Sequence, residues 1–323
     1  EIEGLRFRCY SGEDDIAAMA QVIRAANTAN DEAEYVSDDY LRSQVVNHSH
    51  YPPQEARLLA LVGESIVACS EYEHADTTDG RRDYSSFGQV HPKWRRRGIG
   101  TAMAAWNEAR LLELAAREKH PGGAALTTWI EEADIGATVL ARARGYSRTR
   151  IGFHMVRPDM DDIDVPSLPE GLEVRPVTND DLPRIWEAMI EAFRDHHGGR
   201  DGSKAAYRRW MEDPILDTAL LVIAFEGDEV AGGVQGWVDP EENEANGYLR
   251  GWTDPVFTRR PWRRRGLAYA LLGRALAAVR DRGMTSAQLG VDPENPFQAL
   301  TLYERHRFAT VRTGSEWTKV IEP

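Results

Sequence analysis

The sequence predicts an α+β protein made of two tandem copies of one domain, each a mixed central sheet flanked by helices. The length of 323 residues fits about two domains of ordinary size. Sequence segments of the first half recur in the same order in the second half, and both halves mix strand and helix patterns. With 42% apolar and 28% charged residues, the composition excludes disordered, collagen-like and coiled-coil classes.

The internal repeat has three matching segments. Gly4-Leu5 with Arg8 corresponds to Gly171-Leu172 with Arg175. The other two matches are residues 60–68 with 224–232, and Trp-Arg-Arg-Arg-Gly at 94–98 with the same five residues at 262–266. The offset stays near 164 to 168 residues, which indicates a duplicated domain and is far too long for a solenoid repeat.

The join between the copies is rich in proline and acidic residues. Residues 157–171 hold three prolines and five acidic residues and show little periodicity, which is typical of an exposed linker. We therefore place a first domain at 1–157, a linker at 158–170 and a second domain at 171–323.

Each copy is predicted to run strand, helices, strands, helix, strand, helix, strand. Asp180 or Asp181 can cap the first helix, Gly227-Asp228 marks a hairpin turn, and Gly283 closes the helix that carries an apolar stripe. In the second copy, the expected strands are 172–177, 219–225, 230–238, 248–258, 287–291 and 311–320. The first expected helix ends at 193, the second spans 267–280 and the third spans 296–307.

The net charge and the cysteine content limit which partners and which cellular compartment we expect. Lys and Arg number 39 against 52 Asp and Glu, and a net charge of −13 argues against a nucleic-acid binder, which needs clustered positive charge. Cys9 and Cys69 are expected to be reduced thiols in a cytoplasmic protein. The sequence has no basic, apolar leader and no run of 18 apolar residues, so we expect no signal peptide and no membrane partner. We expect a monomer or homodimer.

The turn that follows the fourth strand pattern of each copy favours an anion. The first N–H groups of a helix lack partners, the helix dipole places positive charge there, and glycine lets a ligand approach the backbone. Neighbouring guanidinium groups add bidentate donors, so a pyrophosphate is the expected ligand. The two turns are Arg95-Arg96-Arg97-Gly98-Ile99-Gly100 and Arg263-Arg264-Arg265-Gly266-Leu267-Ala268.

Two common nucleotide motifs do not fit these turns. A Walker loop ends in Gly-Lys-Ser/Thr, and a dinucleotide fingerprint needs a third glycine where Met103 and Leu271 stand. The turns instead resemble the acetyl-CoA loop of the GNAT acetyltransferase superfamily, Arg/Gln-x-x-Gly-x-Gly/Ala, in both halves. The resemblance implies that acetyl-CoA binds there, and that the preceding strand, at Val90 and at Val256, Phe257 and Thr258, bonds its acyl and pantetheine groups.

A second motif follows in the second copy only. The segment from Asn295 to Phe308 is similar to the family pattern Asn-x-x-Ala-x-x-Leu-Tyr-x-x-x-Gly-Phe, with Arg307 in place of the glycine. The resemblance implies that Asn295 contacts pantetheine and that Tyr303 donates a proton to the CoA sulfur. Read without the resemblance, Asn295 is a helix N-cap before Pro296, and Tyr303 is a packing residue.

The first copy lacks these groups. Aligning Gly145 with Arg307 places Ala133 where Asn295 stands and Ala141 where Tyr303 stands. We therefore expect a phosphate loop without chemistry in the first copy, and acyl transfer in the second.

The general base is less clearly marked. Asp254 lies on the same strand face as Val256 and Thr258, and is our candidate base, although an Asp before Pro255 also suits a turn. The loop residues Asp195, His196 and His197 are a second candidate, and the resemblance implies that this loop lines the acceptor pocket. We expect no metal.

These observations predict an N-acetyltransferase that moves an acetyl group from acetyl-CoA to a primary amine of a small molecule by direct attack, since no Cys or Ser–His relay is evident. The alternatives are a non-catalytic acyl-CoA-binding sensor or scaffold, and an N-acetyltransferase that acts on peptides or proteins. A pure binder would have no reason to keep Tyr303 and Asn295 in one copy alone.

Overall fold

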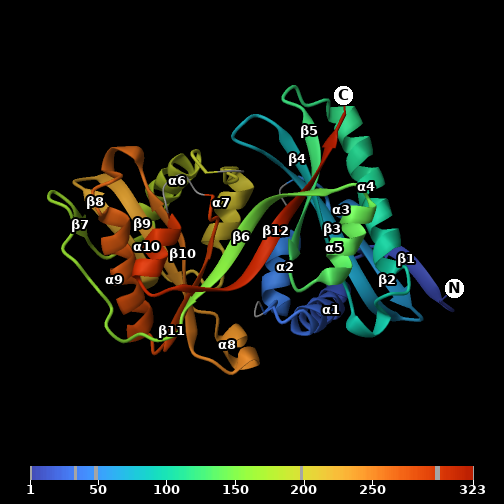
Figure 1. The fold of residues 1–323 in the computed structure, drawn as a ribbon, viewed down its shortest axis with the longest axis horizontal. Helices are drawn as coiled ribbons and strands as arrows, with labels where there is room; N and C mark the ends of the chain where they lie inside the picture. Colours follow the sequence, from blue (N-terminus) through green and yellow to red (C-terminus); the bar gives the residue numbers. More distant parts are fainter. Residues whose placement is uncertain (1, 33–34, 47–49, 197–198, 295–298, 323) are drawn as a thin grey trace. The chain divides into compact units, whose positions relative to one another are not determined.

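The computed structural model describes residues 2–32, 35–46, 50–196, 199–294 and 299–322. By contacts, the chain divides into two compact units. The first unit consists of residues 1–150, 203–209 and 315–323, and the second of residues 151–202 and 210–314. Each unit is a mixed sheet flanked by helices, as the sequence predicts (Figure 1).

In the first unit, the strands β1 to β5 lie side by side in chain order. Only β4 and β5 pair in parallel, because the long helix α4 connects them. The elements are β1 Leu5–Cys9, α1 Ile16–Ala29, α2 Asp38–Val46, α3 Pro53–Ala56, β2 Arg57–Val62, β3 Ser65–Asp76, β4 Arg82–Val90, α4 Ile99–Glu118, β5 Ala124–Glu131 and α5 Ile135–Ala143.

The second unit repeats this plan with the strand order β6, β11, β10, β9, β8, β7. Strands β10 and β11 are its parallel pair, connected by α9. Most of α7 and the end of β12 belong to the first unit. The elements of this part of the chain are β6 Ser147–Arg157, β7 Glu173–Val174, α6 Leu182–Phe193, α7 Lys204–Met211, β8 Leu221–Glu226, β9 Glu229–Trp237, α8 Pro240–Asn246, β10 Arg250–Thr258, α9 Leu267–Asp281, β11 Ser286–Val291, α10 Ala299–Arg305 and β12 Ala309–Ile321.

The last strand of each copy completes the sheet of the other unit. Residues 153–157 of β6 pair antiparallel with 287–291 of β11, and both segments belong to the second unit. The end of β12, residues 315–321, belongs to the first unit, where β12 is the neighbour of β5. The compact units therefore do not coincide with the contiguous spans 1–157 and 171–323, and those spans stay a prediction about the sequence copies.

The sequence patterns did not give the bounds of two short helices. The first, α8, starts at Asp239, whose side chain accepts hydrogen bonds from the N–H groups of Glu241 and Glu242, and Pro240 opens its first turn. The second, α7, carries Trp210, whose indole donates to Gln235. The Asp-Pro pair of α8 was a readable start signal, but seven residues are too few to show periodicity.

The helix α9 packs tightly on the sheet of the second unit. Its buried side chains join those of β8, β9 and β11 in one core cluster. Gly251 makes this approach possible, because a Cβ there would lie 2.3 Å from Val279. The sheet face that carries Gly236 and Gly251 is therefore the face that α9 covers.

The segment 158–170, which we expected to be an exposed linker, is largely exposed and is also hydrogen-bonded to α9. Asp164 accepts a hydrogen bond from the Tyr269 hydroxyl at 2.9 Å, and the carbonyl of Pro166 accepts one from Arg274 at 2.8 Å. Gly273 has no room for a side chain, since a Cβ would lie 2.1 Å from the Asp164 carbonyl oxygen. Residues outside 171–323 thus contribute to the packing of the second unit.

Candidate active site

The two arginine-glycine turns have the same backbone. The central residue is left-handed in both turns, with φ 61° at Arg96 and 60° at Arg264, and so is the glycine, with φ 86° at Gly98 and 81° at Gly266. Each glycine precedes a helix whose first turn receives no side-chain cap. The first N–H groups of α4 and α9 therefore stay available to an anion.

The first arginine of each turn holds the turn in place. Arg263 donates to the Thr258 carbonyl at 2.9 Å and pairs with Asp195 at 2.5 Å. Arg95 makes the corresponding bonds to the Val90 carbonyl at 3.1 Å and to Asn30 at 2.8 Å. Both guanidinium groups therefore shape the loop from inside.

The remaining arginines lie at the surface. Arg96 and Arg264 are exposed, and Arg97 lies over the Trp94 ring at 4.9 Å. Arg265 donates to the Glu170 carbonyl at 3.0 Å. The second and third arginines are therefore the better candidates for phosphate contacts.

Asp195 forms ion pairs with arginines at this loop. Its carboxylate pairs with Arg260 and Arg263, which hold its pKa well below the usual range. His196 stacks on Phe193 with ring centroids 4.5 Å apart, and His197 lies outside the described residues. The contacts give Asp195 a structural role, and acceptor binding by this segment stays a prediction.

In each unit, the parallel pairing stops well before the arginine-glycine turn. The ladder between β10 and β11 runs from Arg250↔Ser286 to Trp252↔Gln288, although β10 continues to Thr258 and β11 to Val291. In the first unit, the β4–β5 ladder likewise ends at Ser85↔Thr127. Beyond these points, the inner edge of β10 can offer backbone groups to an extended ligand.

One orphaned polar atom fits such a ligand. The Thr258 hydroxyl oxygen is buried and has no hydrogen-bond partner among the described residues. Thr258 is the last residue of β10, which a short helical turn at Arg260–Trp262 separates from the arginine-glycine turn. A buried hydroxyl is normally paired, so its state indicates that a polar ligand passes here.

A β-bulge distinguishes β10 from its counterpart. Asp254 and Pro255 lie opposite the single residue Gln235 of β9, because the register shifts between Thr253 and Val256. In the first unit, β3 and β4 pair without a shift from Ala68↔Val90 to Asp76↔Arg82. The extra residue of the second copy stands at the point where the strands separate.

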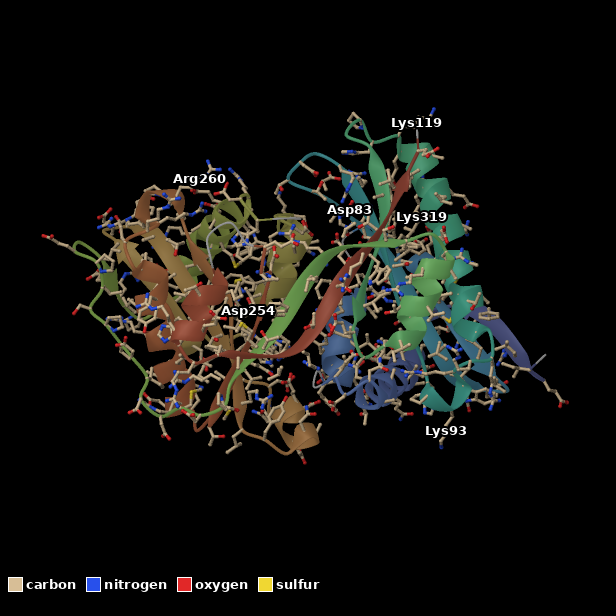
Figure 2. All side chains as sticks on the ribbon, in the orientation of Figure 1. Asp83, Lys93, Lys119, Asp254, Arg260 and Lys319 are labelled. Carbon is tan, nitrogen blue, oxygen red and sulfur yellow. The ribbon has the colours of Figure 1, made fainter. Side chains whose placement is uncertain are left out.

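Asp254 lies at this separation point (Figure 2). Its Oδ2 accepts a hydrogen bond at 3.3 Å from the N–H of Gly290, two residues beyond the last ladder pair of β11. Burial raises the pKa of Asp254, and the positive charge of Arg200 and the Gly290 hydrogen bond partly oppose this. A carboxylate with a raised pKa is suited to accept a proton.

Tyr303 lies on α10, in the core cluster of the second unit. Its side chain is 7% exposed and packs edge-on against Phe308. Burial raises the pKa of the Tyr303 hydroxyl, and the charge of Asp254 raises it further. The hydroxyl therefore stays protonated and can donate, while Asn295 lies outside the described residues.

The first unit has the same helix end without these groups. Tyr146 N–H bonds the Ala141 carbonyl at 3.0 Å, as Phe308 N–H bonds the Tyr303 carbonyl at 3.0 Å, so Ala141 occupies the tyrosine position. The register places Phe87 where β10 has Asp254 and Pro255. The first copy thus lacks both candidate catalytic groups.

An aromatic and polar cluster next to Asp254 was not expected. Trp237 and Trp252 pair in register and stack with centroids 4.7 Å apart and planes 6° apart. Glu242 of α8, 3% exposed, accepts a hydrogen bond from the Trp252 indole at 3.3 Å. The register of the hairpin could have placed the two tryptophans together, but the sequence does not show which face of the strand they take.

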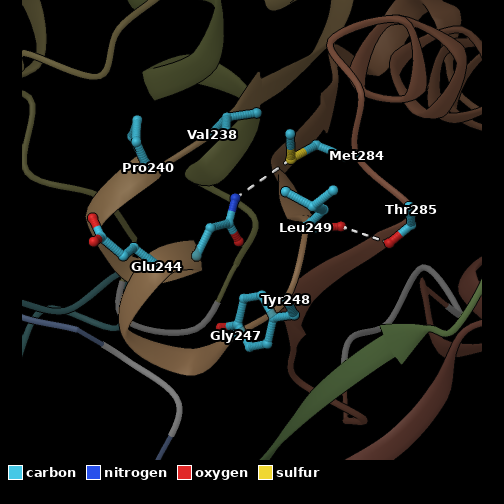
Figure 3. A pocket seen from close by; sticks show the side chains of 9 residues that line it. Val238, Pro240, Glu244, Gly247, Tyr248, Leu249, Met284 and Thr285 are labelled. Carbon is cyan, nitrogen blue, oxygen red and sulfur yellow. Dashed lines mark hydrogen bonds between the residues drawn. The ribbon is translucent and has the colours of Figure 1, made fainter.

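A cavity of about 850 Å³ lies at the far end of β10 from the arginine-glycine turn, around α8 (Figure 3). Its lining residues are Val238, Pro240, Asn243, Glu244, Gly247, Tyr248, Leu249, Met284 and Thr285.

Across the described ranges, no helix is long and apolar enough to cross a membrane. Within the same ranges, no group of three or more His, Cys, Asp or Glu could hold a metal ion.

The family match and the curated relatives identify the class of protein to which this fold belongs, the acetyl-CoA-dependent acetyltransferases. Residues 182–308 match the acetyltransferase (GNAT) family model, and this span includes Asp254, the second turn and Tyr303. The chain belongs to the GNAT acetyltransferase family, and acetyl-CoA is its co-substrate.

Its curated relatives include mycothiol acetyltransferases. That of Salinispora arenicola is 31% identical over 301 residues, covering 91% of this chain and 90% of the relative, and that of Kineococcus radiotolerans is 31% identical over 232 residues, covering 71% and 70%. Among solved structures, a GCN5-related N-acetyltransferase from Sphaerobacter thermophilus aligns with a TM-score of 0.72 at 23% identity, covering 99% of this chain and 96% of that chain. A tandem GNAT protein from the clavulanic acid biosynthesis pathway aligns with a TM-score of 0.65 at 18% identity, covering 99% of both chains.

Proposed function

We propose that the second unit transfers the acetyl group of acetyl-CoA to a primary amine of a small molecule by direct attack. The observation that supports the proposal is Asp254, whose carboxylate accepts a hydrogen bond from Gly290 beyond the last ladder pair of β10 and β11, together with the buried Tyr303, whose pKa responds to the charge of Asp254. A base and a proton donor at one end of an anion-binding strand edge suit acyl transfer from a CoA thioester.

Each group has one task in the proposed reaction. The amine nitrogen forms a bond to the thioester carbonyl carbon, and Asp254 accepts the proton that the nitrogen loses. The carbon–sulfur bond then breaks, and the Tyr303 hydroxyl donates a hydrogen bond or its proton to the leaving sulfur. Because burial raises the pKa of Tyr303 above that of an ordinary phenol, full proton transfer to a thiolate is unfavourable, and we propose that the hydroxyl acts by a hydrogen bond to the developing thiolate.

We propose a small hydrophilic amine as acceptor, in keeping with relatives named mycothiol acetyltransferases. At 31% identity, the particular acceptor of those relatives is a starting point for a screen. Cys9 and Cys69 are free, which supports our proposal of a cytoplasmic enzyme.

The first unit is proposed to bind acetyl-CoA without turnover. Its turn at Gly98 has the same backbone as the turn at Gly266, and Ala141 replaces the proton donor. Binding at the first unit would stabilise the fold by mass action, by about 2.7 kcal/mol at a hundredfold excess over Kd.

Release of free thiol from acetyl-CoA in the presence of a panel of amines tests the proposal. The panel should include amino sugars, α-amines of cysteine derivatives and lysine-like amines, with the Tyr303→Phe protein as control. Thiol release that needs both an amine and Tyr303 supports it. Binding of acetyl-CoA with no thiol release for any amine would favour the alternative, a sensor or scaffold.

A further inference from the structure

The bulge in β10 leaves one carbonyl group that the strand ladder does not pair in the regular way. Asp254 and Pro255 stand opposite Gln235 alone, and Pro255 has no N–H to donate. The Asp254 carbonyl oxygen instead accepts a hydrogen bond from the Trp237 indole Nε1 at 3.1 Å. One side chain therefore fixes the residue that carries the candidate base.

Trp237 is itself held in place. Its ring lies parallel to Trp252, with centroids 4.7 Å apart, and the His154 ring meets Trp252 edge-on at 5.3 Å. Trp252 donates its indole N–H to the buried carboxylate of Glu242. The stack therefore has one polar anchor at each end, the Asp254 carbonyl and Glu242.

The Glu242 anchor is fully engaged. Besides Trp252, its carboxylate accepts hydrogen bonds from the Tyr248 hydroxyl at 2.8 Å and from the Gln288 amide at 2.6 Å. Gln288 is 0% exposed and is also bonded to His154 at 3.1 Å. A network with all of its members paired fixes side-chain positions more strongly than packing alone.

The first unit has neither the bulge nor the indole. The strand β3 pairs with β4 without a shift, and the repeat offset of 164 places Glu73 at the position of Trp237. The second copy therefore has the bulge, the Trp237 indole that bonds it, Asp254 and Tyr303. The first copy has none of these four features. A purely structural tryptophan would have no reason to follow the catalytic candidates.

We infer that Trp237 is a positioning residue for acyl transfer, whose indole N–H holds the Asp254 bulge in the orientation that the reaction needs. This inference rests on the proposed function of the second unit. Because the bond is made to the backbone of Asp254, its loss should let the bulge rotate and should affect Asp254 more than the distant phosphate contacts at Gly266.

Replacing Trp237 by 3-benzothienylalanine tests this, because a sulfur atom replaces the N–H while ring size and stacking are kept. We expect kcat to fall about 10- to 100-fold, since small displacements of reacting groups have effects of that size. The affinity for acetyl-CoA should stay within about threefold of wild type by calorimetry, as the Gly266 turn is untouched. The acidic limb of the kcat pH profile should move to lower pH, because a looser bulge exposes Asp254 to water.

The same analogue at Trp317 is the matched control. Trp317 is 4% exposed and donates its indole N–H to Ser315 at 3.1 Å, in the first unit. Wild-type kcat for the control with reduced kcat for the Trp237 protein supports the inference. Where the analogue cannot be incorporated, Trp237→Phe removes the same N–H and its melting temperature shows whether the fold is kept.

The outcomes separate the inference from the proposed function. An active wild type together with unchanged kcat and an unchanged acidic limb in the Trp237 protein overturns the inference alone. An equal loss in the Trp237 and Trp317 proteins overturns it as well, because it indicates a general loss of stability. A wild type that releases no thiol with any amine overturns the proposed function and this inference with it.

Discussion

The guanidinium group of Arg307 lies 3.2 Å from Oδ2 of Asp159, and the Arg307 backbone is left-handed with φ 64°. The family pattern has glycine at this position, where a left-handed residue ends the helix. Here the arginine takes the strained conformation, and its side chain also donates to the Asp161 carbonyl at 3.2 Å. The same residue thus closes α10 and ties down the segment that follows β6.

Substitution of Arg307 should separate these two effects. Arg307→Gly relieves the left-handed strain and loses the partly exposed ion pair, so we expect a stability change within about 1 kcal/mol. Arg307→Ala keeps the strain and loses the pair, and should be less stable than the glycine variant by about 1 kcal/mol. Urea denaturation of both proteins measures the difference, and an alanine variant as stable as the glycine variant would contradict the strain.

Tyr303→Phe keeps the packing against Phe308 and removes one hydroxyl. If Tyr303 is the proton donor, kcat should fall by about 10² to 10⁴, with acetyl-CoA affinity preserved. Steady-state kinetics and calorimetry on the same preparation measure both quantities. Activity that stays within about threefold of wild type would assign Tyr303 to packing.

The pH dependence of the rate should carry the signature of Asp254. Only the carboxylate form can accept a proton, and burial raises its pKa above the ordinary value of 3.8. Turnover should therefore fall as pH drops through this raised pKa. A kcat profile of wild type and Asp254→Asn checks this, because the asparagine protein should be slower and should lose this limb. An unchanged profile would leave the base unidentified.

The two arginine-glycine turns should differ in their effect on turnover. A β-branched side chain is strained at the left-handed positions Gly98 and Gly266, and it blocks close approach to the helix start. Gly266→Val should weaken acetyl-CoA binding in the second unit and abolish most turnover. Gly98→Val should lower the number of acetyl-CoA sites per chain from two to one and keep most turnover. Calorimetric titration counts the sites, and one site in both the wild type and Gly98→Val would exclude binding by the first unit.

Removal of the C-terminal segment should destabilise the first unit. Residues 315–323 belong to that unit, where Lys319 pairs with Glu108 and Trp317 lies in the core cluster with Leu126. A chain that ends at Gly314 should show faster hydrogen exchange in β5. Exchange in β8 and β9 serves as the internal control, because both belong to the second unit. Unchanged protection of β5 would show that the strand is dispensable.

The sequence by itself determined the features that local chemistry specifies. Residues that lie close together in the chain specify the duplication, the arginine-glycine turns and the amphipathic helix α9. They also show that the first copy has Ala141 at the position that corresponds to Tyr303. A glycine directly before a run of apolar residues with helical spacing indicates that a helix starts there. The predicted start of α9 at Leu267 is the observed one.

Only the tertiary structure decided which strand completes which sheet and how β10 presents its groups. The exchange of the last strands depends on pairing between residues more than a hundred positions apart, and no local preference encodes it. The bulge at Asp254, the indole bond from Trp237 and the internal bonds of Arg263 are likewise set by register and by neighbours on other strands. A one-residue shift in register moves each side chain to the other face of the sheet, so the placement of these groups is a property of the assembled fold.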